Sequence, residues 1–173
     1  MAEPREHCVI VGAGHSAAQL CLSLRQADWS GRITLIGDEP HAPYHRPPLS
    51  KTALNPAQSD TRQPLRATSF YADNDIDLRL GVAVQRIDRD AKRIHLDNGE
   101  LDYDTLVLAT GSLHRRPPIP GVDDRRVFNL RTAADAEQVC AAATNGKRAA
   151  IIGGGFIGLE AAASLRKLGL DVV

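Results

Sequence analysis

The hydrophobic positions of this chain form short continuous runs, each followed by a glycine turn or an amphipathic stretch. Residues 7–11 are apolar without alternation, which is typical of a parallel strand that is covered on both faces. Residues 16–27 place their apolar side chains on one stripe at helical spacing, and Gly31 then interrupts the chain. Residues 32–36 are apolar again. This order predicts a βαβ unit, for which a right-handed crossover is expected.

The middle of the chain has a different pattern. Residues 40–69 are rich in proline and predict a long loop, which in a compact domain is usually functional. Asp97-Asn98-Gly99 separates two runs of an antiparallel meander and predicts a turn, because Asn-Gly tolerates positive φ. The remaining segments predict a helical turn at 70–74, strands at 76–80, 82–88, 93–96, 101–103 and 105–109, and a helix at 133–143 that is capped at Asn145-Gly146.

Two glycine-rich loops each stand between an apolar run and a helical stretch. The first is Gly12-Ala13-Gly14, and the second is the GGGFIG sequence of residues 153–158, which precedes a predicted helix at 159–168. In such loops one glycine permits the turn, another lets the backbone approach a pyrophosphate, and a third small residue lets helix and strand pack closely. One loop alone is weak evidence. Two loops with agreeing flanks predict a protein that moves electrons between two dinucleotides.

The second loop belongs to a second predicted βαβ unit. Residues 149–152 predict its first strand, Gly169 ends its helix, and residues 171–173 begin its second strand. In the first unit, Asp38 and Glu39 directly follow the second strand. Either carboxylate could accept hydrogen bonds from ribose hydroxyls, although acidic residues after a strand are also common in turns.

Composition and charge exclude several classes of function. The 173-residue chain has zero formal net charge and 4% aromatic residues, which argues against a nucleic-acid surface. No apolar run is long enough to cross a membrane, and the N-terminus lacks a signal-peptide pattern, so we expect a cytoplasmic protein. The three cysteines form no CxxC or CxxxxC pair and the six histidines form no ligand cluster, so no metal site is predicted.

Four segments together resemble one family. They are Val11-Gly12-Ala13-Gly14, the Pro43–Lys51 sequence PYHRPPLSK, the Leu106–Ser112 sequence LVLATGS, and the Ile152–Glu160 sequence IGGGFIGLE. In order and spacing the chain resembles the N-terminal part of FAD-dependent NAD(P)H ferredoxin and rubredoxin reductases of the putidaredoxin reductase type. These belong to the larger group shaped like glutathione reductase. The PYHRPPLSK segment is the most specific, and the redox cysteines of the related disulfide reductases are missing here.

The resemblance implies an α/β fold in which a Rossmann-like FAD-binding domain, with a parallel sheet and an antiparallel β-meander, precedes a second Rossmann unit for NAD(P). We therefore expect the N-terminal part of an FAD-binding domain at 1–120, a connection and helix at 121–146, and an incomplete NAD(P)-binding domain at 147–173. Members of the family are longer. We expect this chain to be a piece that alone binds FAD weakly and has little activity, with the residue that selects NADH or NADPH beyond residue 173.

The resemblance also implies roles for individual residues. Lys51 would lie near the reactive nitrogen of the flavin, and Glu160 would approach the nicotinamide and could pair with Lys51. A cation at the flavin would stabilise the negative charge that accumulates on reduction. The expected cofactor-binding residues are Gly12, Gly14, His15, Ser16, Ala17, Asp38, Glu39, Arg46, Pro47, Lys51, Val84, Ala109, Thr110, Gly111 and Arg131 for FAD, and Gly153, Gly155, Phe156, Ile157, Gly158 and Glu160 for NAD(P)H.

The function implied is a flavoprotein oxidoreductase that passes electrons from NAD(P)H through FAD to a small iron–sulfur protein, a ferredoxin or rubredoxin, of an oxygenase or P450 system. Two alternatives stay open: an NADH-dependent reductase of a small molecule, and a non-catalytic FAD-binding module. Arg115 and Arg116 predict either a solvated pair or a docking point for an acidic ferredoxin.

Overall fold

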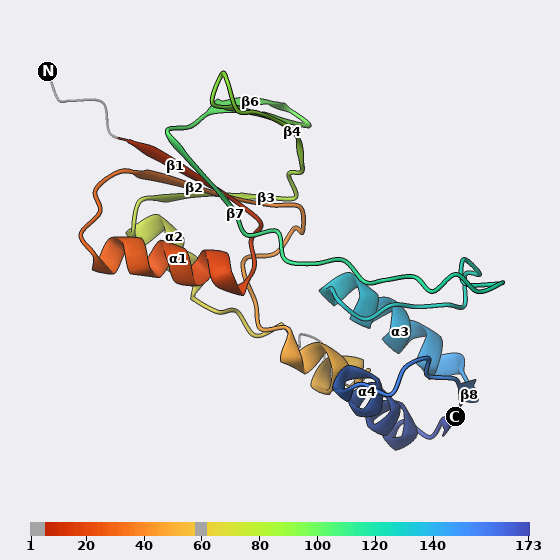
Figure 1. Ribbon diagram of the computed structural model, residues 1–173. Helices are drawn as coiled ribbons and strands as arrows, with labels where there is room; N and C mark the ends of the chain where they lie inside the picture. The colour runs from red at the N-terminus through yellow and green to blue at the C-terminus, as the bar shows by residue number, and fades with distance from the viewer. Residues whose placement is uncertain (1–5, 58–61) are drawn as a thin grey trace, which may run out of the picture. The chain divides into compact units, whose positions relative to one another are not determined.

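The computed structural model describes residues 6–57 and 62–173 (Figure 1). Internal contacts divide the chain into two compact units. One consists of the residues up to 44 together with 64–112, and the other consists of 45–63 together with 113–173. Each unit is described separately below. The functional domains expected at 1–120, 121–146 and 147–173 are defined by the cofactor they bind, and they stay a prediction.

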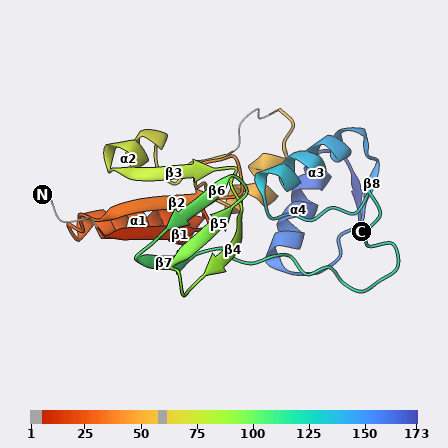
Figure 2. The same cartoon turned by 90° about the horizontal axis from the view of Figure 1, so that it is seen from above.

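The first unit is built on a four-stranded parallel sheet in the order β3-β2-β1-β7 (Figures 1 and 2). Its strands are β1 (His7–Val11), β2 (Arg32–Gly37), β3 (Ile76–Leu80) and β7 (Thr105–Leu108). Val9 of β1 stands between Thr34 of β2 and Leu106 of β7 in the register. Strand β1 is therefore paired along both edges. Its side chains pack on both faces of the sheet, Cys8 and Ile10 on one and Val9 and Val11 on the other, which explains why residues 7–11 are apolar without alternation.

The two faces of this sheet are covered by different elements. Helices α1 (His15–Gln26) and α2 (Thr68–Asp73) lie on one face, and the antiparallel strands β4 (Val84–Asp88), β5 (Arg93–Leu96) and β6 (Gly99–Asp102) lie on the other (Figure 1). Side chains alternate along a strand, so β1 and β2 contribute side chains to both cores. The helix-side core contains Cys8, Ile10, Ala17, Cys21, Ile33, Leu35, Tyr71 and Ile76, and the opposite core contains Val9, Val11, Ile36, Ile94 and Leu96.

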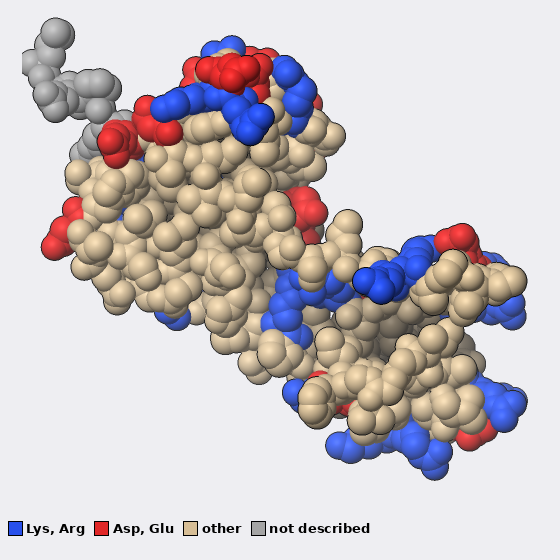
Figure 3. All heavy atoms as spheres, viewed as in Figure 1, with Lys and Arg blue, Asp and Glu red and all other residues tan. Residues whose placement is uncertain are grey.

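The outer surface of the antiparallel sheet carries paired charges of both signs. Arg93 binds Asp102 at 2.5 Å and Glu100 at 3.1 Å, and His95 lies 2.8 Å from Glu100. Figure 3 shows Lys or Arg and Asp or Glu side chains gathered together over the β4–β6 sheet. Because the pairs are exposed and mutually compensating, this face has no strong net charge that would attract a polyanion.

Arg25 of α1 joins several turns of the first unit. Its guanidinium donates hydrogen bonds of 2.7–3.0 Å to the carbonyl oxygens of Trp29, Gly31, Asn74 and Asp75. The first two carbonyls lie between α1 and β2, and the other two lie between α2 and β3. One side chain thus fixes both connections at the amino ends of the neighbouring strands.

The second unit is mainly helical. Its elements are the 3-10 turns η1 (Pro47–Ser50) and η2 (Thr52–Leu54), the helices α3 (Ala133–Asn145) and α4 (Phe156–Lys167), and the short strands β8 (Arg148–Ala149) and β9 (Asp171–Val172). Helix α3 starts with a capping box in which Thr132 and Asp135 satisfy each other's backbone amides. Both 3-10 turns pack against α3 and α4.

Strands β8 and β9 are parallel and α4 connects them, so the predicted start of a second βαβ unit is confirmed. Ala143 of α3, Leu165 of α4 and Leu170 form its small core. The first strand is shorter than expected. Sequence predicts 149–152, but the ladder is limited to the two residues of β8 that pair with β9, followed by one hydrogen bond from the amide of Ile151 to the carbonyl of Val173.

The α/β fold with a parallel sheet and an antiparallel meander is confirmed. Helix α3 begins at Ala133 as predicted, whereas α1, α2 and α4 begin before their predicted residues. The largest difference is in α4, which begins at Phe156 rather than at 159, because its first turn contains the glycine-loop residues themselves. Asn145 is the last residue of α3, and Gly146 follows in an extended conformation rather than a left-handed one. Over the described ranges 6–57 and 62–173, no helix has the length and apolarity needed to traverse a bilayer.

Candidate functional site

The first glycine loop lies at the carboxyl ends of three parallel strands. The amide of Gly12 donates to the carbonyl of Ile36 at 2.8 Å, and the amide of Ala109 donates to the carbonyl of Val11 at 2.8 Å. Gly12 has φ +105°, and a Cβ there would lie 2.4 Å from the carbonyl oxygen of Ala109. Gly12 is therefore required by the packing of the loop against the end of β7. In open α/β sheets this edge is where ligands bind.

Gly14 has different surroundings from those of Gly12. It is the N-cap of α1, its φ is −105°, and a Cβ there would meet nothing within 4 Å. The fold of the unit thus does not demand a glycine at this position, and the space beside it is open. The amides of the first helical turn have no intrahelical acceptor, and the helix dipole favours an anion there. These features fit the pyrophosphate of a dinucleotide.

Residues 15–17, which follow Gly14, differ in their exposure to solvent. His15 and Ser16 are exposed in the first turn of α1, whereas Ala17 is fully buried in the helix-side core. Ala17 can therefore take part in cofactor binding only through its backbone. At the end of β7, Thr110 and Gly111 are exposed.

The two carboxylates after β2 have different surroundings. The hydroxyl of Tyr44 donates a hydrogen bond to Oε2 of Glu39 at 2.6 Å, and Tyr44 is 4% exposed. Glu39 is thus held by a buried phenol, while Asp38 is exposed. Both follow the strand whose end commonly carries the ribose-binding carboxylate. The geometry favours Asp38 over Glu39 for that contact.

Val84 begins β4, where it pairs with Leu96 of β5 and is partly buried. A register shift between Val84 and Arg86 marks an irregularity in this strand pair. Such irregularities are common where a strand ends near a ligand site. The backbone contact expected of Val84 stays a prediction.

The second glycine loop, like the first, has one glycine that packing requires and another that lies beside open space. A Cβ on Gly158 would lie 2.5 Å from the carbonyl oxygen of Gly153, which has φ +114°. Gly155 is the N-cap of α4, and a Cβ there would meet nothing within 4 Å. One glycine is thus required for packing and another leaves open space before a helix N-terminus, which fits a second dinucleotide. Phe156 and Ile157 are 88% and 60% exposed in the same turn.

The 3-10 turns η1, in the PYHRPPLSK segment, and η2, directly after it, lie against α4 within the second unit. The Nζ of Lys51 is 3.1 Å from Oε1 of Glu160, so the predicted pairing of these residues is confirmed. Oγ of Ser50 donates to Oε2 of the same carboxylate at 2.5 Å. Lys51 also lines a pocket that includes Pro47, Pro48 and Thr52.

The Glu160 carboxylate is stabilised in its charged form by two neighbours and stays accessible to solvent. The hydrogen bond from Ser50, and then that from Lys51, holds the pKa of Glu160 below its usual range. The side chains of Lys51 and Glu160 are 51% and 36% exposed. A ligand can therefore reach both charges. Sequence reasoning missed Ser50, although it adjoins Lys51.

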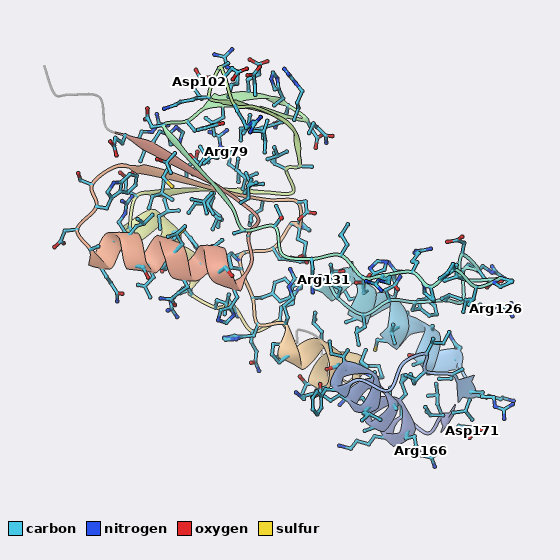
Figure 4. All side chains as sticks on the ribbon, viewed as in Figure 1. Arg79, Asp102, Arg126, Arg131, Arg166 and Asp171 are labelled. Atoms are coloured by element: carbon cyan, nitrogen blue, oxygen red, sulfur yellow. The ribbon has the colours of Figure 1, made fainter. Side chains whose placement is uncertain are left out.

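Arg46 and Arg131 also lie together in the second unit. The guanidinium of Arg46 donates to the carbonyl oxygen of Arg131 at 2.8 Å. Arg131 directly precedes α3, where Figure 4 labels it. This contact brings together two of the residues expected at FAD, from segments far apart in the sequence. Within residues 6–57 and 62–173, no three His, Cys, Asp or Glu side chains are grouped so that they could hold a metal ion.

The expected site residues are thus distributed over the two units. The first unit carries Gly12, Gly14, His15, Ser16, Ala17, Asp38, Glu39, Val84, Ala109, Thr110 and Gly111, and the second carries Arg46, Pro47, Lys51, Arg131, Gly153, Gly155, Phe156, Ile157, Gly158 and Glu160. Their individual roles toward FAD and NAD(P)H stay predictions.

Comparison with known proteins agrees with this arrangement. Rhodocoxin reductase of Rhodococcus erythropolis is 46% identical over 165 residues, which are 95% of this chain and 39% of the relative. The ferredoxin reductase for the CYP199A2 system from Rhodopseudomonas palustris superposes with a TM-score of 0.89 at 40% identity, over 96% of this chain and 41% of that structure.

A crystal structure of the covalent putidaredoxin reductase–putidaredoxin complex matches with a TM-score of 0.83 at 39% identity, over 96% of this chain and 41% of that structure. The chain spans about two fifths of the length of these relatives. Residues 6–173 also match the family model described as pyridine nucleotide-disulphide oxidoreductase. The family match covers both units and both glycine loops, and the chain therefore belongs to the pyridine nucleotide-disulphide oxidoreductase family.

Proposed function

We propose that this chain is part of a flavoprotein reductase that takes a hydride from NAD(P)H onto FAD and passes electrons to a small iron–sulfur protein. The observation that carries the proposal is the contact of Lys51 with Glu160 at 3.1 Å. It joins the last residue of the PYHRPPLSK segment to the helix that begins at the second glycine loop. The ion pair thus connects the segment proposed to bind FAD with the helix proposed to bind NAD(P)H.

Each glycine loop supports the binding of one dinucleotide. Gly14 and Gly155 each leave open space before a helix N-terminus, where backbone amides and the helix dipole would hold a pyrophosphate. Exposed Asp38 would accept hydrogen bonds from the adenosine ribose of the first cofactor. Phe156 and Ile157, exposed at the start of α4, would contact the second.

FAD, when bound, supplies the chemistry that accepts two electrons as a hydride and releases them one at a time. The ammonium of Lys51 would stabilise negative charge at the flavin. The carboxylate of Glu160 would keep that ammonium in place and orient the nicotinamide. Because the pair is partly exposed, both side chains remain available to a ligand.

The electron acceptor is proposed from the relatives. One solved structure is a complex of putidaredoxin reductase with putidaredoxin, and one relative is a ferredoxin–NAD(+) reductase component of the p-cumate 2,3-dioxygenase system in Pseudomonas putida. We propose a ferredoxin-type partner of an oxygenase or P450 system for this chain. The zero net charge of the chain favours neither nucleic acid nor a polyanionic membrane surface as a partner, and a cytoplasmic location is part of the proposal.

The test is an anaerobic absorbance spectrum of a polypeptide that carries this chain, reconstituted with FAD, before and after addition of NADH or NADPH. Bleaching of the visible flavin bands is expected. Turnover is then measured with a [2Fe–2S] ferredoxin, with a rubredoxin and with monodehydroascorbate. Rapid turnover with the last alone would favour a small-molecule reductase, and flavin binding without bleaching would indicate a non-catalytic module.

A further inference from the structure

The side chain of Ser50 lies at the junction of η1 and α4 in the second unit. Ser50 is 4% exposed, and its Oγ is 2.5 Å from Oε2 of Glu160 and 3.4 Å from the carbonyl oxygen of Pro47. A hydroxyl has one proton to donate. The shorter contact to a charged acceptor is the stronger, so the proton points to Glu160.

The carboxylate of Glu160 is therefore held at both oxygens by consecutive residues. Oε1 faces the Nζ of Lys51 at 3.1 Å, and Oε2 accepts from Ser50. The side chain of Lys51 is 51% exposed, has four rotatable bonds and can follow a ligand. Ser50 is buried and short. The serine is thus the fixed contact of the carboxylate, and the lysine is the adjustable one.

A second hydrogen bond presets the position of Ser50. Oγ of Ser164 donates to the backbone carbonyl of Ser50 at 2.8 Å. Glu160 and Ser164 are four residues apart on α4 and so share one helix face. Ser50 contacts that face with both its side chain and its main chain. Its hydroxyl is directed at Glu160 by the docking of the turn and not by chance rotation.

We propose that Ser50 is a positioning residue, whose hydroxyl holds the Glu160 carboxylate in a fixed orientation beside Lys51. Its catalytic consequence rests on the proposed reductase function, in which Glu160 orients the nicotinamide and holds Lys51. Ser50 itself would contact neither cofactor. It acts through the carboxylate that it holds.

The effect of Ser50 on the pKa of Glu160 can be separated from the effects of nearby charges. Within the described residues, the charged side chain placed against the carboxylate is Lys51, and the turns η1 and η2 contribute no titratable side chain. Strand β9 contributes Asp171, which lies 3.2 Å from Arg148. The lowered pKa of Glu160 has the Ser50 hydrogen bond as its largest cause and Lys51 as its second.

The first test needs no cofactor. The 173-residue chain is labelled with ¹³C at its glutamate carboxyl groups, and the Glu160 signal is assigned by its loss in Glu160→Gln. In Ser50→Ala the pKa of Glu160 should rise relative to the wild type. Ser50→Thr keeps a hydroxyl and should restore the lower pKa. Ser164→Ala removes the hydrogen bond to the main chain of Ser50 but leaves the Ser50 hydroxyl in place, so the pKa of Glu160 should rise less than in Ser50→Ala.

An unchanged titration in Ser50→Ala overturns the inference. An equal rise in Ser164→Ala also overturns it, because the effect would then come from docking of the turn and not from the hydroxyl. Circular dichroism of each variant checks that the helices are intact. These outcomes decide the role of Ser50 even where the reductase chemistry itself is absent.

The second test follows flavin reduction by NADH in stopped flow, with the polypeptide that carries this chain. Ser50→Ala should slow reduction by about twofold to fivefold, the range of a partly exposed charged contact, with Ser50→Thr close to the wild type. The pH at which the rate falls on acidification should move upward in Ser50→Ala. A wild-type protein whose flavin does not bleach contradicts the proposed function. A bleaching protein with unchanged rates in Ser50→Ala contradicts the catalytic consequence of the inference.

Discussion

The ammonium of Lys51 and the carboxylate of Glu160 lie 3.1 Å apart, which joins the turn between η1 and η2 to the first helical turns of α4. Both side chains are more than one-third exposed. Ion pairs in such surroundings contribute little to folding, because water screens the attraction and two side chains must be ordered. The pair therefore contributes little to folding, and its proposed role is toward a bound ligand.

Replacing Lys51 should separate these two effects. In Lys51→Gln the midpoint of thermal unfolding should shift by no more than about 2–4 °C, as expected for an exposed pair. The rate of flavin reduction by NADH should fall by about tenfold or more, because the cation near the flavin is lost. Stopped-flow absorbance and a thermal melt measure the two quantities.

Lys167→Gln is the matched control for that experiment. Lys167 is an exposed lysine in the last turn of α4. Its replacement should leave flavin reduction at the wild-type rate. Equal losses of rate in the two variants would show that general surface charge, and not the pair with Glu160, governs the reaction.

The first glycine loop predicts opposite outcomes for two similar substitutions. Gly12→Ala places a Cβ 2.4 Å from the carbonyl oxygen of Ala109 at φ +105°, so the free energy of unfolding should fall by about 2–4 kcal/mol. Gly14→Ala meets nothing within 4 Å, and its unfolding free energy should stay within about 1 kcal/mol of the wild type. Its affinity for FAD should nevertheless fall by about tenfold or more, because the methyl group occupies the open space beside the helix start.

Urea unfolding of the apo chain and titration with FAD test this pair of substitutions. Trp29, the single tryptophan of the chain, lies in the first unit and reports its unfolding. Normal FAD binding by Gly14→Ala would mean that the open space is not the pyrophosphate site.

These glycines show how far sequence reasoning reaches. The spacing of the loops predicts that glycines are needed. Whether a glycine is required by packing or lies beside open space depends on which atoms lie opposite its Cα. For Gly12 that neighbour is Ala109, which is almost a hundred positions away in the chain. Such a contact is set by the pairing of β1 with β7, and local patterns do not contain it.

Elements with strong local signals are predicted well. Strands β3 and β5 have the predicted bounds, because each is an alternating run between turn residues. The turns η1 and η2 lie in a segment predicted to be loop, because short 3-10 turns in a proline-rich sequence have no helical periodicity. The family resemblance predicts the contact of Lys51 with Glu160. It does not predict the hydrogen bond from Ser50 or the different surroundings of Asp38 and Glu39, which depend on side-chain geometry.

Arg25 should be important for the stability of the first unit. Its guanidinium donates to four carbonyl oxygens and lies 5.9 Å from the centre of the Trp29 ring. Arg25→Lys keeps the charge but cannot reach four acceptors, so the unfolding free energy should fall by about 2–4 kcal/mol. Urea unfolding followed by Trp29 fluorescence measures the loss. Gln26→Lys, at the neighbouring exposed position, should stay within about 0.5 kcal/mol, and similar losses in both variants would contradict the role of the guanidinium.

His7 should make the stability of the first unit depend on pH. Its ring is buried with Nε2 2.9 Å from Oγ1 of Thr34, and burial, followed by the charge of Arg32, lowers the pKa of His7. The unfolded chain then binds a proton at a higher pH than the folded chain. The stabilising contribution of the neutral ring is complete above the unfolded pKa of about 6.5 and is lost progressively as the pH falls below it.

His7→Gln should therefore lose less unfolding free energy than the wild type when the pH is lowered from about 7.5 to about 5.5, a window that brackets the unfolded pKa. Urea unfolding at the two pH values, followed by Trp29 fluorescence, gives the difference for each protein. The exposed His114 offers the control, and His114→Gln should keep the wild-type dependence. Equal pH dependence in wild type and His7→Gln would mean that the His7 ring accepts a proton in the folded chain as readily as in the unfolded one.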